Sequence, residues 1–179
     1  MANDPIGANF FEGCLGVVQL TYDGVDLGLT IDEANIEFME DIKDIFYAQF
    51  GTQPYDKIPT GQAYQMTCKL GEQTLARMAK LIRGFTYSGN SAKLGVDLYR
   101  SGRTNFSKIL QIKRVDSDGN QSSNELYRLY FYKAMPIISG VIANFGPDAQ
   151  REFDVTFYVF KDETKNCFGF SGYASSLGL

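Results

Sequence analysis

Hydrophobic and polar positions alternate along several stretches of the chain, and this period of two predicts a mainly β fold. The clearest alternation covers residues 151–161, a predicted strand with one buried face and one exposed face. The inward positions are Phe153, Val155, Phe157 and Val159, and the outward positions are Glu152, Asp154, Thr156 and Tyr158. The same pattern predicts strands at residues 16–22, 108–115 and 126–134.

A longer stretch, residues 29–83, carries the densest series of predicted elements. Alternation around Ile36 predicts one strand, the charged run 40–44 predicts a bend, and the aromatic residues that follow predict a second strand. Residues 31–50 are therefore expected to form a protruding hairpin. Glycine and proline break the second strand, and a third strand is expected to begin at Gly61.

One helix is predicted over residues 72–83. Its apolar side chains recur at i, i+3, i+4 and i+7 on one stripe, and they are Leu75, Met78, Ala79 and Ile82. Further along, Pro136 is expected to interrupt a strand, with a new strand at residues 137–145. About eight mostly antiparallel strands and one flanking helix imply an antiparallel β-sandwich or barrel.

The length of 179 residues predicts one domain with segments left over as arms. The folded body is expected at residues 14–161, with an N-terminal arm at 1–13 and a C-terminal arm at 162–179. Each arm carries aromatic anchors that are expected to dock on another subunit, namely Phe10 and Phe11 in the first and Phe168 and Phe170 in the second. Frayed termini are the alternative for both arms.

The composition excludes several kinds of chemistry. Histidine is absent, which removes the commonest general base and metal ligand, and no glycine-rich phosphate loop is present. We therefore expect neither an enzyme nor a bound cofactor or metal. The three widely spaced cysteines, Cys14, Cys68 and Cys167, are interpreted as buried free thiols. No apolar run is long enough for a membrane span, and the N-terminus shows no secretory signal.

Charge is distributed unevenly along the chain. Residues 31–45 contain six acids and one lysine, whereas residues 77–114 contain nine bases and one aspartate. A subunit with acidic and basic regions can associate head to tail with its own copies. The candidate contacts are the acids Glu40, Asp41 and Asp44 and the bases Arg77, Arg100 and Arg103. The alternative is that both regions are simply solvated surface.

Several pieces of the central stretch together resemble the bacteriophage tail tube protein (major tail protein) family. They are Phe38–Glu40 at the end of a strand, the Gln-x-Gly-x-x-Pro-x-Asp loop at 49–56, Gly61 at the start of a strand, and Gly-Glu-x-Thr-Leu at 71–75. The resemblance covers about a third of the chain. It implies a tail-tube-like fold, six copies in a ring, and rings stacked into a hollow tube.

The resemblance also implies a role as the conduit through which DNA leaves the virion and enters the host cell. A lumen for DNA should repel phosphates, because bound phosphates would slow transit, and the candidate lumen-facing acids are Glu37, Glu152 and Asp154. The implied partners are further copies of the chain and the sheath, baseplate, tape measure and terminator proteins. DNA passes without specific binding. The implied location is the virion tail, assembled in the host bacterial cytoplasm without membrane insertion.

Two other functions remain open from the sequence. One is the tube of a secretion or contractile injection machine that carries protein cargo. The other is a monomeric β-sandwich binding module, which the absence of tryptophan makes less favoured because aromatic stacking platforms are common in such modules.

Overall fold

One antiparallel sheet of eight strands dominates the computed structural model, which describes residues 17–71, 74–89, 91–93, 106–115, 122, 124–139 and 152–173. The strand order is β2-β1-β7-β8-β9-β4-β3. The short strand β10 pairs with residues 129–131 of β8, and β9 pairs with residues 133–139 of the same strand. These strands are β1 (Val18–Tyr22), β2 (Val25–Leu29), β3 (Asn35–Ile45), β4 (Asp56–Leu70), β7 (Lys108–Arg114), β8 (Arg128–Ser139), β9 (Phe153–Phe160) and β10 (Gly169–Ser171). The remaining elements are helix α1 (Leu75–Leu81), the small hairpin β5 (Thr86–Ser88) and β6 (Ser91–Lys93), and the 3₁₀ turns η1 (Ala48–Phe50) and η3 (Glu125–Tyr127).

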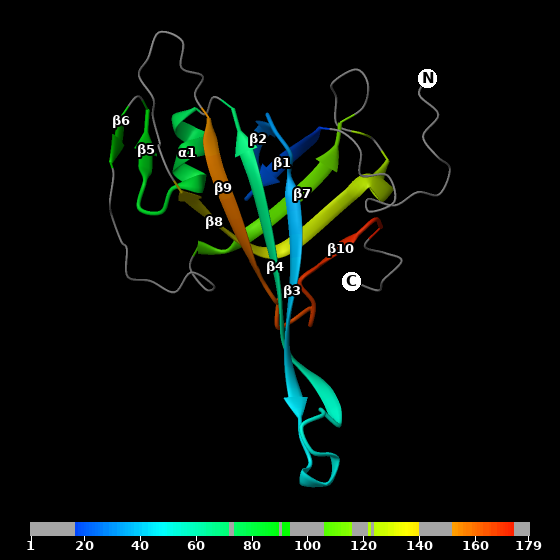
Figure 1. Cartoon of the computed structure of the whole chain (residues 1–179). Coiled ribbons are helices and arrows are strands. Elements are labelled where there is room, and N and C mark those ends of the chain that lie inside the picture. Colours follow the sequence, from blue (N-terminus) through cyan, green and yellow to red (C-terminus); the bar gives the residue numbers. More distant parts are fainter. Residues whose placement is uncertain are drawn as a thin grey trace.

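The sheet curls into a barrel-like body because its two sides meet. Thr30, directly after β2, forms an antiparallel bridge with Leu70 at the end of β4. The N–H of Ile31 then donates to the carbonyl of Lys69 at 3.0 Å. In Figure 1, β7 and β8 consequently lie behind β9 and β4. The mainly β, antiparallel class with a flanking helix is confirmed.

The inner face of this curved sheet holds the core. Its buried side chains include Leu20, Tyr22, Leu27, Met66, Cys68, Leu70, Leu110, Ile112, Leu129, Phe131, Phe153, Val155, Phe157 and Val159. The predicted inward and outward positions of β9 are confirmed, because its burial alternates along the whole strand. The buried Tyr22 hydroxyl bonds to the carbonyls of Phe106 and Ala134, at 2.8 and 3.1 Å, so it carries no desolvation penalty for a missing partner.

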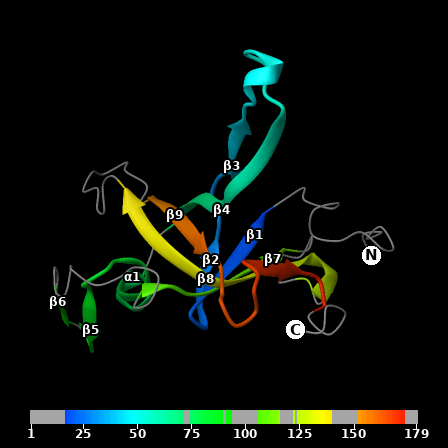
Figure 2. The same cartoon turned by 90° about the horizontal axis from the view of Figure 1, so that it is seen from below.

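A long hairpin leaves the barrel, and we call its residues 40–62 the arm (Figures 1 and 2). It is built by β3 and the first half of β4, paired from Glu40↔Gln62 to Ile45↔Asp56. β9 pairs with β4 only from Tyr64 onwards, so no described third strand supports the arm. Both faces of the arm are therefore exposed to solvent.

The stretch does form a protruding hairpin, but the predicted bend at residues 40–44 and the predicted bounds 31–50 are wrong. β3 continues through the charged run to Ile45, and the hairpin instead turns at residues 46–55. Charges are tolerated inside this strand because neither face of the arm is buried. The irregularity that does occur is a bulge, in which Thr60 lies between the pairs Asp41↔Gly61 and Ile42↔Pro59.

Two other strand boundaries in the structure also differ from the predicted ones. β4 begins at Asp56, five residues before Gly61, and it contains Pro59. β8 runs through Pro136 to Ser139 instead of stopping there. Both prolines are compatible with a strand because no described strand pairs with them on one side. β9 does not reach Pro59, and the described pairing of β7 with β8 ends at Ala134.

The helix is shorter than the predicted 72–83. α1 spans Leu75–Leu81, and Thr74 caps it by accepting a hydrogen bond from the backbone N–H of Arg77 at 3.3 Å. The side chain that enters the core is Leu81, which is 1% exposed, whereas Leu75 of the predicted stripe is 40% exposed. The predicted N-terminal arm and the strand at 137–145 beyond Ser139 lie outside the described residues.

Candidate functional site

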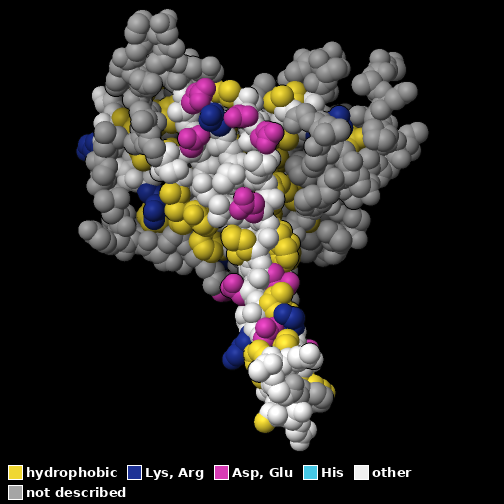
Figure 3. Space-filling model, viewed as in Figure 1, with side chains coloured by type: hydrophobic (Ala, Val, Ile, Leu, Met, Phe, Trp, Pro, Cys, Tyr) yellow, Lys and Arg dark blue, Asp and Glu magenta, His cyan; other side chains and the backbone are white. Residues whose placement is uncertain are grey.

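The three predicted lumen-facing acids lie on one outer face of the sheet. Glu37 is opposite Gln65 across β3 and β4, and Asp154 is opposite Lys69 across β9 and β4. Glu37, Glu152 and Asp154 are all exposed. Figure 3 shows this polar face, with acidic side chains gathered above the root of the arm. Whether the face lines a lumen stays a prediction.

Lys69 is a basic side chain at the centre of this acidic face. Its Nζ lies 3.3 Å from a carboxylate oxygen of Glu152 and 3.8 Å from one of Asp32. The hydrogen bond to Glu152, together with the nearby negative charges, raises the pKa of Lys69. The lysine is therefore held charged, and it neutralises only part of the charge of the four acids Asp32, Glu37, Glu152 and Asp154.

The tip of the arm is formed by the Gln-x-Gly-x-x-Pro-x-Asp motif. Gly51 adopts a positive φ of 66°, a backbone conformation that glycine accepts without strain. The N–H of Tyr55 donates to the carbonyl of Ile45 at 2.8 Å, which closes the turn. The rings of Tyr47 and Tyr55 meet edge to face with centroids 5.0 Å apart. The tip thus has a defined shape.

Apolar side chains are unusually exposed along the arm (Figure 3). Phe46, Tyr47 and Tyr55 at the tip are 56%, 53% and 59% exposed, and Ile42 and Ile58 on the shaft are 55% and 46% exposed. Ile42 and Ile58 lie on opposite faces of the hairpin, because Ile42 is paired with Pro59 and Ile58 with Lys43. The exposed rings at the tip, where Tyr47 and Tyr55 are in contact, are the candidate interaction site. Sequence reasoning missed these residues as contacts, although aromatic residues flanking a Gly/Pro loop beside a charged run were a usable signal.

The predicted acidic contacts lie along the shaft of the arm. Glu40 accepts a hydrogen bond from the Gln62 amide at 3.1 Å, and Asp44 pairs with Lys57 at 2.9 Å. Asp41 is exposed beside the bulge. The structure places Glu40, Asp41 and Asp44 on one strand, β3, and their role as contacts stays a prediction.

Of the three predicted basic contacts, Arg77 is the one that lies within the described residues. Arg77 lies 4.0 Å from Asp26 of its own chain, and Lys80 and Lys113 pair with Asp23 and Glu125. These ion pairs reduce the positive potential that the sequence suggested. α1, which carries Arg77, lies at the end of the barrel far from the arm (Figure 1). Arg100 and Arg103 lie outside the described residues, as do Phe10 and Phe11.

Phe168 and Phe170 pack on their own chain rather than remaining available to another subunit. Phe170 is in β10, is 8% exposed, and stacks on Tyr130 with ring centroids 5.0 Å apart. Phe168 packs against Tyr64 at 5.1 Å. The expectation that these two side chains anchor the C-terminal segment on a neighbouring subunit is therefore corrected, because residues 162–173 fold back onto the barrel of their own chain.

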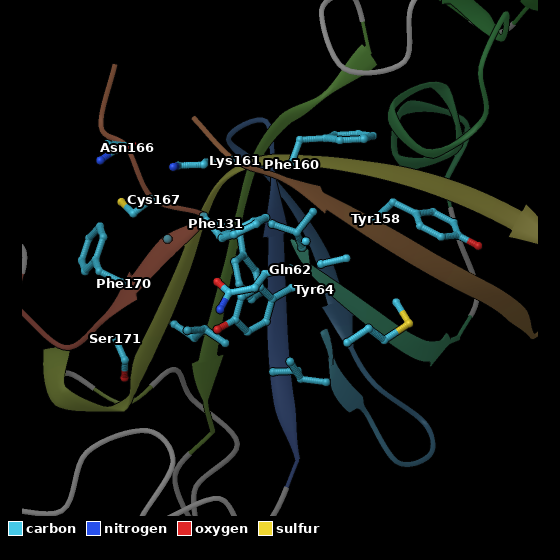
Figure 4. A pocket seen from close by; sticks show the side chains of 18 of the residues that line it. Gln62, Tyr64, Phe131, Tyr158, Phe160, Lys161, Asn166, Cys167, Phe170 and Ser171 are labelled. Carbon is cyan, nitrogen blue, oxygen red and sulfur yellow. The ribbon is translucent and has the colours of Figure 1, made fainter. Parts of the chain in front are cut away.

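A groove of about 1060 Å³ lies at the root of the arm, between β4 and the segment that carries β10. Its lining includes the aromatic side chains Tyr64, Phe131, Phe168 and Phe170. Figure 4 shows Tyr64 and Gln62 at its centre, with Cys167, Phe170 and Ser171 along one side. Lys161 is the charged side chain among the lining residues. Sequence reasoning missed the groove because it joins segments that are far apart in the chain.

Two of the three cysteines, Cys68 and Cys167, lie within the described residues. Cys68 is buried and free, and burial raises its pKa to about 12, whereas Cys167 is free and half-buried. No group of three or more potential metal ligands forms within the described parts of the chain. None of the helices in those parts is long and apolar enough to cross a membrane.

No protein-family model matches the chain, and no curated protein matches it. Among solved structures, the chain is similar to a cryo-EM structure of the anti-feeding prophage cap, the tube terminating cap. The two share 11% identity over 88% of each chain, with a TM-score of 0.45. That TM-score is too low to carry an argument about function. The mainly β fold is established by the strands of the chain itself.

Proposed function

We propose that this chain is a structural subunit of a phage tail tube, which self-assembles into stacked hexameric rings and forms the conduit for DNA ejection. The observation that carries the proposal is the arm. It extends from the barrel without a described third strand, carries the family-like loop at its tip, and exposes five large apolar side chains. A subunit that remained monomeric would keep this surface in water at a cost in solubility.

The acidic outer face supports the tube in particular. Glu37, Glu152 and Asp154 share one face of the sheet that also gives rise to the arm. A ring that turned this face inward would present a negative surface to DNA and would repel its phosphates. The arm would then be free to reach a neighbouring subunit or ring.

The proposal is tested by shortening the arm in the full chain. Ile45 and Asp56 are directly paired, so residues 46–55 can be replaced by Asn-Gly, which favours the tight turn of a two-residue hairpin. Sedimentation velocity and negative-stain microscopy would compare this variant with wild type at low and high salt. A matched control, Thr52→Ala/Gln53→Ala, changes polar residues in the same loop.

Wild type and the control are expected to form rings of six times the 20.0 kDa chain mass, and stacked tubes. Salt should loosen the tubes because it screens exposed charges. The shortened variant should stay monomeric with an unchanged circular dichroism spectrum. Wild-type monomers at every concentration and salt would instead favour a monomeric binding module.

A further inference from the structure

A β-bulge interrupts the pairing of β3 with β4 inside the arm. Asp41 is paired with Gly61. Its neighbour Ile42 is paired with Pro59, which leaves Thr60 as the extra residue on β4. We propose that this bulge sets the direction in which the arm leaves the barrel, and so places the tip where assembly requires it. The inference rests on the proposed self-assembly and names the feature of the chain that aims the arm.

The sequence of β4 favours a bulge at this position. Proline cannot donate a hydrogen bond to the ladder, so within sheets it is confined to edges, strand starts and bulges, and a glycine inside a strand often marks a bulge. Pro59 and Gly61 lie on either side of the extra residue Thr60. The Thr60 hydroxyl also donates to the carbonyl of Asp41 across the two strands at 3.1 Å. The bulge is therefore held by a specific contact.

The bulge lies where the arm has lost the support of β9. The last row that joins three strands contains Tyr64, which is paired with Phe38 on β3 and with Val159 on β9. Beyond this row the arm consists of two strands (Figures 1 and 2), and the bulge is the one irregularity in their described pairing. A bulge bends its strand and increases the local twist. In a two-stranded segment it can therefore redirect everything beyond it.

The two strands remain paired on both sides of the bulge. On the barrel side the Gln62 amide donates to Glu40 at 3.1 Å, and on the tip side Lys57 pairs with Asp44 at 2.9 Å. Such exposed contacts are individually weak, but regular pairing continues beyond the bulge from Ile42 to Ile45. The bend is consequently passed on to the tip by a continuous ladder.

A small change of direction at the bulge displaces the tip by a distance that matters for contacts. Asp56, at the base of the tip, lies four residues beyond Thr60, or about 13 Å at ~3.3 Å per residue. A turn of about 20°, comparable with the usual twist between neighbouring strands, would move that point by roughly 5 Å. Apolar contacts require heavy atoms within ~4.5 Å, so a misdirected arm would lose the contacts made by its tip.

Deletion of Thr60 gives a direct test, because it removes the bulge and leaves the neighbouring pairs in register. Thr60→Val is the matched control, since it retains the extra residue and loses only the hydroxyl. A second variant combines the deletion with Pro59→Val, because proline cannot donate in the regular ladder that the deletion creates. It replaces the single deletion if that variant does not fold.

The direction of the arm would be measured in the unassembled full chain by double electron–electron resonance between two nitroxide labels. One label is attached at Thr52→Cys in the turn of the arm. The other is attached either at Lys93→Cys on β6 or at Val17→Cys before β1, both of which are exposed. Cys68 is buried and its pKa is raised to about 12, so it is not labelled. The other native thiols are removed by Cys14→Ser and Cys167→Ser.

Wild type and Thr60→Val are expected to give the same distances from tip to barrel, because both retain the bulge. Deletion of Thr60 should shift at least one of the two distances by roughly 5 Å, with an unchanged circular dichroism spectrum. Without labels, the deletion should raise the concentration needed for assembly by roughly tenfold, which corresponds to about 1.4 kcal/mol.

Distances that stay the same after deletion would overturn the proposal, because the bulge would then not aim the arm. Altered distances with assembly equal to wild type would overturn it too, since assembly would not depend on the direction of the arm. Failure of wild type to assemble would overturn the tube and the assembly role of the bulge together. The distances in the unassembled chain would still show whether the bulge directs the arm.

Discussion

Strand β4 belongs to both the barrel and the arm, yet its two halves differ in burial. In β4 the residues Met66, Cys68 and Leu70 are buried, whereas every residue from Asp56 to Thr60 is exposed. The pairing with β3 continues across both regions. Backbone hydrogen bonding alone therefore does not distinguish a core strand from an arm; the difference is the presence or absence of a packed face.

This difference assigns the two regions different roles. The barrel is stabilised by its own apolar interior, which the inward side chains of its strands fill. A two-stranded hairpin is marginally stable in water by itself, so the arm depends on the barrel at its root and, in the proposed assembly, on a partner at its tip. Stability and assembly should consequently be separable by mutation.

The largest effect on folding is expected for Phe157→Ala in the barrel. Phe157 is 0% exposed, and its ring centroid lies 5.7 Å from that of Tyr22. Truncation of such a side chain leaves a cavity and costs about 3–5 kcal/mol. Urea unfolding monitored by circular dichroism would measure the loss.

The counterpart on the arm is Phe46→Ala, which removes the same side chain from an exposed site. Its unfolding free energy should stay within about 0.5 kcal/mol of wild type, while assembly is weakened. Equal destabilisation by the two substitutions would break the distinction between barrel and arm, because it would mean that the tip is packed in the monomer.

An intermediate effect is expected for Gly169→Ala in β10. A Cβ at this position would clash with the carbonyl oxygen of Tyr130 and would lie 3.0 Å from the Cα of Phe131. Backbone atoms cannot move aside as a side chain can, so β10 must shift away from β8, at a cost of about 1–3 kcal/mol. Thermal unfolding would show the loss as a lower Tm.

Gly61→Ala on the arm is the matched control for this substitution. There the added Cβ would meet the flexible carboxylate of Asp41 at 3.3 Å, which can rotate away. A Tm that is unchanged in both variants would show that β10 is not held tightly on the barrel, and it would weaken the description of the groove wall.

The barrel was largely predictable from sequence, whereas the arm was predicted as a protruding hairpin but with its turn in the wrong place. Alternation in β9 gave correct local structure, because one buried face enforces the period of two. The charged run 40–44 was misinterpreted because exposed strands carry no such pattern. A strand with two solvated faces can hold Glu40, Asp41 and Asp44 in succession without penalty.

The candidate surfaces also differ in how far the sequence alone could predict them. Counting alternate positions along one predicted strand placed Glu152 and Asp154 on one face, whereas Glu37 joins them only through the pairing of β3 and β9 with β4. The groove did not, because Tyr64, Phe131 and Phe168 come from three separate segments and meet only through the register of the folded sheet. The pairing of Arg77 with Asp26 was hidden for the same reason.

The smallest effect is expected for Asp162→Asn, at the point where the chain leaves β9 for the groove wall. The Asp162 carboxylate accepts hydrogen bonds from the backbone N–H groups of Thr164 and Lys165 at 2.9 and 3.0 Å, and it lies 3.3 Å from the Lys133 ammonium. The Lys165 N–H, with the other partners, lowers the pKa of this carboxyl below its ordinary 3.8.

Because the pKa is lower in the folded state, the charged carboxylate stabilises the fold fully above pH 3.8, and this contribution is lost as the pH falls through the folded value. Asp162→Asn should therefore lower the Tm slightly at pH 7, and the difference from wild type should vanish in more acidic solution. Calorimetry across this range would measure it, with Glu37→Gln on the acidic face as the control. A Tm difference between Asp162→Asn and wild type that did not change with pH would mean that the charge of Asp162 does not stabilise the turn. The groove wall, like the barrel, would then not depend on exposed charges.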